Sequence, residues 1–161
     1  MIRKIIIGLT GIAILALLNF SIWRNEDLLE NGKIVYFELA PVDPRSLIQG
    51  DFMRLNYRID NIEGWKDTDT VILKLDEKRI ATGAAPDFLG DPEANEMRMA
   101  WYQGANDHLQ IRPDTFLFQE GSARDYARAR YARFHVAKNG RALLTGLADR
   151  DLTLIRPTRA E

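Results

Sequence analysis

A charge-free run at residues 5–23 constrains the fold of this 161-residue chain more than any other feature. As an α-helix these nineteen residues extend about 28 Å, close to the thickness of the hydrocarbon core of a bilayer. Trp23, at the end of the run, is typical of a helix end at the membrane interface. The run therefore predicts a single transmembrane helix that stays attached to the chain as a signal anchor.

The charges on either side of the run predict its orientation. Basic residues precede it, and the segment after it soon becomes acidic: Arg3 and Lys4, then Glu26, Asp27 and Glu30. Because positive flanks stay on the cytoplasmic side, we expect residues 1–4 in the cytoplasm, residues 5–23 in the inner (cytoplasmic) membrane and an extracytoplasmic, periplasmic C-terminal domain. A cleaved signal peptide is the alternative, but the run ends in bulky residues where a signal peptidase requires small ones.

The composition limits the available chemistry. The chain has no cysteine, so the part outside the membrane cannot be held by disulfides and has no thiol nucleophile or thiolate metal ligand. Residues 26–111 hold 17 acidic and 9 basic residues, whereas residues 112–161 hold 6 acidic and 10 basic ones. The two halves can complement each other within one fold, and the alternative is a basic surface that faces anionic lipids or an acidic partner. Nucleic acid is not an expected partner outside a membrane.

Beyond the run, residues 24–33 form a polar, acidic spacer, and residues 34–161 are expected to form one β-rich domain. Strand patterns occur at residues 34–39, 52–59, 70–75, 79–83, 97–102, 108–112, 115–119, 134–137, 141–145 and 152–155. The Asn139-Gly140 pair predicts one hairpin, and residues 104–107 a second. Residues 122–125 resemble a capping box and predict a short helix over residues 126–133. The expected fold is mainly β (α+β), an antiparallel sandwich or partly closed barrel with one short helix behind a transmembrane helix.

The most specific pattern in the chain is Gly-Asp-Phe-Met-Arg-Leu-Asn-Tyr at residues 50–57. Gly50 permits the turn that starts a strand, and Asp51 can accept hydrogen bonds from nearby backbone N–H groups. In the strand that follows, Leu55 and Tyr57 share one face by the period of two. The simpler interpretation is structural: a turn, a strand start and a core face. The alternative is a ligand or partner site around Asp51 and Tyr57.

A second block, at residues 116–134, combines aromatic side chains with charges. It includes Phe116, Phe118, Glu120, Gly121, Tyr126, Arg130 and Tyr131. On the predicted helix, Tyr126 and Arg130 are four residues apart and can share a face. A solvated arginine-rich helix is the simpler interpretation. The alternative is that one arginine forms a bidentate pair with Asp51 or Glu120.

With these two blocks the chain resembles the GDYXXLXY family, named after its motif, with Phe52 in place of the first tyrosine. The lead-in Asp-Pro-Arg-Ser-Leu at residues 43–47 is also similar, and the likeness extends over most of residues 34–155. The resemblance implies a membrane-anchored, extracytoplasmic protein without an assigned activity, often associated with multi-spanning membrane proteins. The candidate ligand or partner site consists of Gly50, Asp51, Leu55, Tyr57, Glu120, Gly121, Tyr126, Arg130 and Tyr131.

Signals for an enzyme are weak. His108 and His135 lie in separate strand-like segments without metal-ligand spacing, and the sequence has no nucleophile elbow and no Gly-rich phosphate loop. We expect no catalytic residue, metal or cofactor, and an accessory or interaction module that works with a polytopic membrane protein or another envelope component. The alternative is an envelope hydrolase that uses Asp51 and Glu120 as paired carboxylates.

Overall fold

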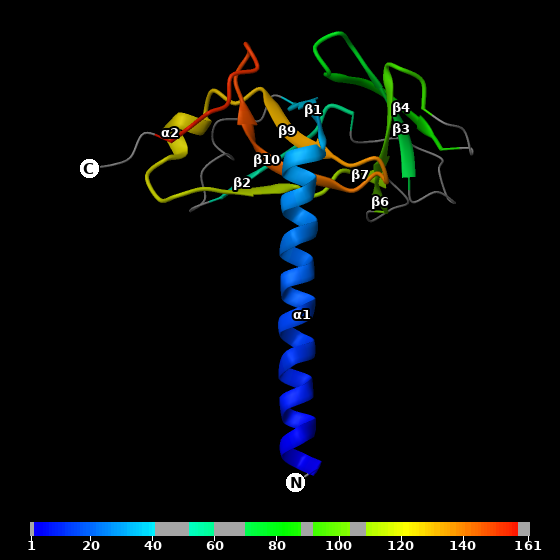
Figure 1. The fold of residues 1–161 in the computed structure, drawn as a ribbon. Helices are drawn as coiled ribbons and strands as arrows, with labels where there is room; N and C mark the ends of the chain where they lie inside the picture. The colour runs from blue at the N-terminus through cyan, green and yellow to red at the C-terminus, as the bar shows by residue number, and fades with distance from the viewer. Residues whose placement is uncertain (1, 41–51, 60–69, 88–91, 104–108, 158–161) are drawn as a thin grey trace.

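A long N-terminal helix carries a β-rich domain at its C-terminal end (Figure 1). The structure is a computed structural model, and it describes residues 2–40, 52–59, 70–87, 92–103 and 109–157. Helix α1 (Ile2–Asn31) is long and apolar enough to cross a membrane. It continues without a break through most of the predicted spacer, which is therefore helical and extends the apolar run.

Among the described residues, α1 contacts the domain through its C-terminal end. The large apolar side chains between residues 5 and 23 are 53–69% exposed, whereas Leu28 is 3% exposed. Asn25 accepts a hydrogen bond through Oδ1 from Nη2 of Arg141 at 3.0 Å. Gly32 then turns the chain into the first strand, and a Cβ at this position would lie 2.3 Å from the carbonyl oxygen of Leu28. Only glycine therefore fits this exit from the helix.

The domain consists of short antiparallel strands and one turn of helix. A three-stranded sheet has the order β1-β9-β10, and a second has the order β4-β3-β5. Two ribbons, β2-β8 and β6-β7, complete the described strands, which do not close into a barrel. The elements are β1 (Lys33–Glu38), β2 (Phe52–Arg54), β3 (Thr70–Leu75), β4 (Ala81–Pro86), β5 (Glu96–Ala100), β6 (Tyr102–Gln103), β7 (Leu109–Gln110), β8 (Thr115–Leu117), α2 (Ala123–Tyr126), β9 (Tyr131–Val136) and β10 (Ala142–Ala148). The expected mainly β (α+β) fold behind an apolar helix is confirmed.

The hydrophobic core is formed by the inner face of the β1-β9-β10 sheet together with buried residues of the other strands. The rings of Phe37 and Phe134 pack edge to face at 5.3 Å, and Tyr57 lies 6.0 Å from each of them. Strand β9 is central in its sheet and buries alternate residues, Ala132, Phe134 and Val136. This alternation is the period-two pattern of a strand whose one face covers a core.

The predicted short helix begins where expected, directly after Ser122, but its extension over residues 126–133 is wrong. Helix α2 ends at Tyr126, and Tyr131 already begins β9. The backbone of Arg130 explains the difference, because its N–H donates to Ala148 O and its carbonyl accepts from Leu39 N–H, both at 2.8 Å. Hydrogen bonds to two neighbouring strands, with an apolar face to bury, outweigh the helix propensity of an arginine-rich segment. Ser122 also makes no side-chain capping bond, so the capping-box signal did not extend a helix.

Other strand predictions hold with shifted ends. The two hairpins are confirmed, because β9 pairs with β10 around Gly140, at φ +85°, and β6 pairs with β7. The strand expected at residues 52–59 is shorter, since beyond Arg54 only Tyr57 forms an isolated bridge, to Leu39. The strand expected at residues 152–155 is reduced to a bridge between Ala148 and Leu154.

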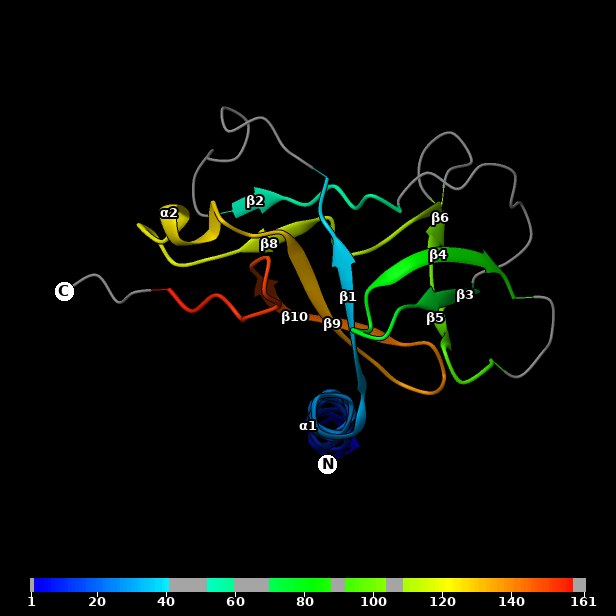
Figure 2. The ribbon, with the colours of Figure 1, turned by 90° about the horizontal axis from the view of Figure 1, so that it is seen from above.

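The domain extends to one side of the helix axis. Seen along that axis, α1 lies at the edge of the domain, β1 leads away from it, and β9 and β10 lie beside β1 close to the helix (Figure 2). The outer face of the β1-β9-β10 sheet therefore receives the end of the helix. Most of the domain projects sideways from the helix (Figures 1 and 2).

Candidate functional site

Residues of the first motif block are part of the hydrophobic core. Leu55 is 2% and Tyr57 4% exposed, and both point to the interior from the segment that follows β2. The Tyr57 hydroxyl donates a hydrogen bond to the Pro113 carbonyl oxygen at 2.5 Å. These contacts support the structural interpretation for Leu55 and Tyr57. Gly50 and Asp51, the other two candidates of this block, lie outside the described residues.

The opposite face of the same segment is open to solvent. Phe52, Arg54 and Asn56 are exposed, and they alternate with the buried Met53 and Leu55. The period-two assignment of the two faces is therefore confirmed. Side chains on the exposed face are available to a ligand, a partner or a lipid surface.

The second block is anchored by a buried tyrosine. Tyr126 is 7% exposed and lies between Phe116 at 5.1 Å and Phe118 at 5.3 Å. Burial raises the pKa of the Tyr126 phenol, and the charge of Asp125 raises this pKa further. The phenol is therefore neutral at physiological pH, and its ring is a packing element.

The remaining candidates of this block occupy the surface. Glu120 is exposed, and Gly121 adopts a φ of +84° that favours glycine. Arg130 has an exposed side chain, whereas Tyr131 is half-buried and pairs in register with Glu38 and Ala148. Because β9 starts at Tyr131, the expected helical pairing of Tyr126 with Arg130 does not exist, and the two are joined instead by a turn.

The two blocks meet in one groove, which we call the motif groove. Its volume is about 210 Å³, and it is lined by Leu39, Ala40, Met53, Arg54, Leu55, Asn56, Tyr126, Ala127, Ala129 and Arg130. The buried members form an apolar floor, and Arg54 and Arg130 are exposed beside it. Among the described side chains, neither guanidinium has a carboxylate within ion-pair distance. Residues about 75 positions apart in the chain thus share one site.

A family model described as "GDYXXLXY protein" matches residues 14–147. The chain belongs to the GDYXXLXY family. The match begins inside α1 and ends inside β10, so it includes both motif blocks and the groove between them. Searches of curated proteins and of solved structures found no match.

The residues of the GDYXXLXY motif divide between the core and the surface of the domain. Its leucine and last tyrosine, Leu55 and Tyr57, support the core under the motif groove. Phe52 occupies the position of the first tyrosine of the motif and is 44% exposed on the outer face. The substitution therefore replaces a phenol with an apolar ring on the surface.

The motif groove combines an apolar floor with two exposed guanidinium groups. An apolar floor of this kind suits an aliphatic or aromatic group, and guanidinium groups pair with carboxylates. Glu120 does not line the groove. Within the described ranges, no cluster of His, Asp and Glu side chains has the grouping that a metal ion requires. Two wider hollows, of about 420 and 530 Å³, contain no motif residue.

Sequence reasoning missed the role of His135. It is 8% exposed on β9, its Nδ1 lies 3.1 Å from Oγ1 of Thr145, and its Cβ faces Gly32 at the end of α1. Burial lowers the pKa of His135, and the charge of Arg133 lowers it further. In the sequence, His135 follows the inward-facing Phe134, so its side chain is expected on the outer face of the sheet. That outer face is buried because the end of α1 lies on it.

Proposed function

We propose that this protein is a membrane-anchored accessory module whose β domain binds a polytopic membrane protein or another envelope component outside the cytoplasm. The observation that carries this proposal is the convergence of both family blocks on the motif groove, where an apolar floor lies beside Arg54 and Arg130. The matching partner segment combines an apolar side chain with a carboxylate. Binding of this kind needs no catalytic group.

The anchor is the second part of the proposal. Residues 5–23 of α1 present apolar side chains that the domain leaves uncovered, and a bilayer is the environment in which such a surface is stable. A signal-peptide cleavage after Leu28 would remove Asn25 and Leu28, which contact the domain, and an earlier cleavage would have to follow the bulky residues that end the apolar run. The helix is therefore proposed to stay attached as a single-pass anchor of the cytoplasmic membrane, with the basic Arg3 and Lys4 inside and the domain outside.

No described contact favours the alternative of an envelope hydrolase. Glu120 is exposed and does not line the motif groove. Its proposed companion, Asp51, lies outside the described residues. We therefore keep the binding module as the proposed function and assign no catalytic residue.

Photo-crosslinking in native membranes tests this proposal. The full chain carries p-benzoylphenylalanine at Asn56, which is exposed and lines the motif groove. We expect one discrete adduct with an envelope protein, because this side chain would face the bound segment. The combined change Arg54→Glu and Arg130→Glu should remove the adduct at an unchanged melting temperature, since both side chains are exposed.

Arg150→Glu is the matched control. Arg150 is also exposed, but it lies in the turn after β10 and does not line the motif groove. The same adduct should form with this variant at wild-type yield. The binding proposal fails if Asn56 yields no adduct, or if the double variant retains it.

A further inference from the structure

We propose that the β domain rests directly on the bilayer and inserts the outer face of the β2–β8 ribbon, with Phe52 and Leu117, into the lipid headgroup region. This inference rests on the membrane anchor proposed above. It adds a second membrane contact, made by a part of the domain that lies to one side of the helix.

The height of the domain above the membrane follows from the contacts of α1. Trp23 ends the apolar run, and Asn25, which binds Arg141 at 3.0 Å, lies only two residues beyond it. Two residues of helix rise about 3 Å, and Leu28 lies about 7.5 Å above Trp23. The headgroup layer is about 5–7 Å thick on each side of the hydrocarbon core. The domain therefore reaches down the helix to the level of the lipid headgroups.

The exposed apolar side chains of the domain lie on the side that faces the membrane in this arrangement. Among the described residues outside α1, three large hydrophobic side chains are exposed: Phe52 at 44%, Tyr102 at 52% and Leu117 at 75%. They belong to β2, β6 and β8. Figure 1 shows β2 and β6 at the edge of the domain nearest the N-terminal half of α1, and β8 pairs with β2.

The register of the ribbon brings two of these side chains together. Phe52 and Leu117 are cross-strand partners. Met53, the next residue in β2, is 6% exposed and points into the core. Phe52 and Leu117 therefore share the outer face of the ribbon, away from the core. Arg54, which also lines the motif groove, follows on the same face of β2 and is exposed.

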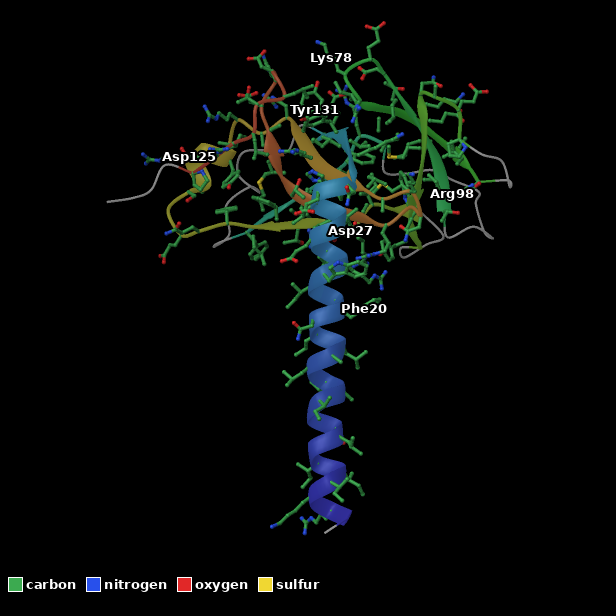
Figure 3. The ribbon with its side chains drawn as sticks, viewed as in Figure 1. Phe20, Asp27, Lys78, Arg98, Asp125 and Tyr131 are labelled. Atoms are coloured by element: carbon green, nitrogen blue, oxygen red, sulfur yellow. The ribbon has the colours of Figure 1, made fainter. Side chains whose placement is uncertain are left out.

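The opposite side of the domain is charged. The turn between β3 and β4 exposes Asp76, Glu77, Lys78 and Arg79, and Lys78 lies at the end of the domain farthest from the helix N-terminus (Figure 3). In the same view Phe20 lies below the domain, whereas Asp27 lies at its level. Along the helix axis, the side of the domain nearer the helix N-terminus exposes apolar side chains and the far side exposes charged ones, as expected if the near side faces a membrane. A bilayer is the occupant that this placement favours over a soluble protein.

Accessibility of spin labels to quenchers tests the inference in the full chain. The absence of native cysteine allows single-cysteine variants without further changes. Labels are placed at Phe52→Cys, Leu117→Cys, Lys78→Cys and Leu15→Cys, and the protein is reconstituted in vesicles of phosphatidylethanolamine and phosphatidylglycerol. Relaxation by lipid-soluble oxygen is then compared with relaxation by a water-soluble nickel chelate. Melting curves check that each variant keeps the fold.

We expect the ratio of oxygen to nickel accessibility to be several-fold higher at Leu117 and Phe52 than at Lys78, and highest at Leu15 within the helix. If Leu15 is in lipid while Leu117 and Phe52 behave like Lys78, the surface contact is refuted and the anchor stands. If Leu15 is also accessible to nickel, the anchor is refuted together with this inference. Protection of Leu117 from both reagents would mean that a second copy covers the ribbon, which also refutes the lipid contact.

Discussion

Tyr57, the last residue of the family motif, allows the structural role of the motif to be separated from a role in binding. Its ring packs against Phe37 and Phe134, and its hydroxyl donates to Pro113 O. In Tyr57→Phe the two ring contacts remain and the hydroxyl is lost. Because Pro113 is exposed, water can replace the lost donor, and the cost should be close to that of one net hydrogen bond, about 1 kcal/mol.

A larger change at the same position gives the second point of comparison. Tyr57→Leu also loses two aromatic contacts of about 0.5–1.5 kcal/mol each and leaves space in the core. The expected loss of unfolding free energy is about 2–4 kcal/mol. For a domain of this size, about 1 kcal/mol corresponds to about 3–5 °C in Tm. The two variants should therefore differ by several degrees.

Urea and thermal unfolding of the full chain in detergent micelles measures these effects. Tyr102→Phe is the control, because Tyr102 is 52% exposed and its variant should change the unfolding free energy by less than about 0.5 kcal/mol. The crosslink from Asn56 is measured on the same samples. An unchanged melt of Tyr57→Phe together with a lost crosslink would refute the structural assignment, because the phenol would then contact the partner.

Three further predictions concern the helix junction, pH and a hairpin. Leu28→Ala should lower the unfolding free energy by about 2 kcal/mol, since Leu28 is 3% exposed, whereas Leu29→Ala, at 45% exposure, should cost less than about 0.5 kcal/mol in the same urea titration. The pKa of His135 is lowered in the folded protein by burial and by Arg133. As the pH decreases below the ordinary value of 6.5, His135 is therefore protonated in the unfolded chain before it is protonated in the folded protein. Stability should be fully present above pH 6.5 and fall as the pH decreases through the lowered pKa, and His135→Gln should flatten that part of the profile; an unchanged profile would contradict the assignment. Gly140→Ala should cost about 1–2 kcal/mol, because φ is +85° and the new Cβ would lie 3.2 Å from the Ala100 nitrogen, while Gly83→Ala meets no atom within 4 Å and should cost clearly less by thermal melting.

Local patterns in the sequence were sufficient for several parts of the fold. The apolar helix follows from nineteen residues without charge, and the two faces of the motif strand follow from alternation. The hairpin at Gly140 follows from the Asn-Gly pair, because its turn requires a positive φ. In each case a short stretch of chain carries the whole physical cause.

Tertiary contacts decided what short stretches could not. Tyr131 is in a strand rather than a helix because β1 and β10 satisfy the hydrogen bonds of β9 on both sides. Leu28 and His135 are buried because the end of α1 lies on the β1-β9-β10 sheet. The motif groove exists because Met53 and Tyr126, far apart in the chain, line the same hollow. Such long-range pairings depend on the free energy of the whole packed domain, and no local sequence pattern contains that quantity.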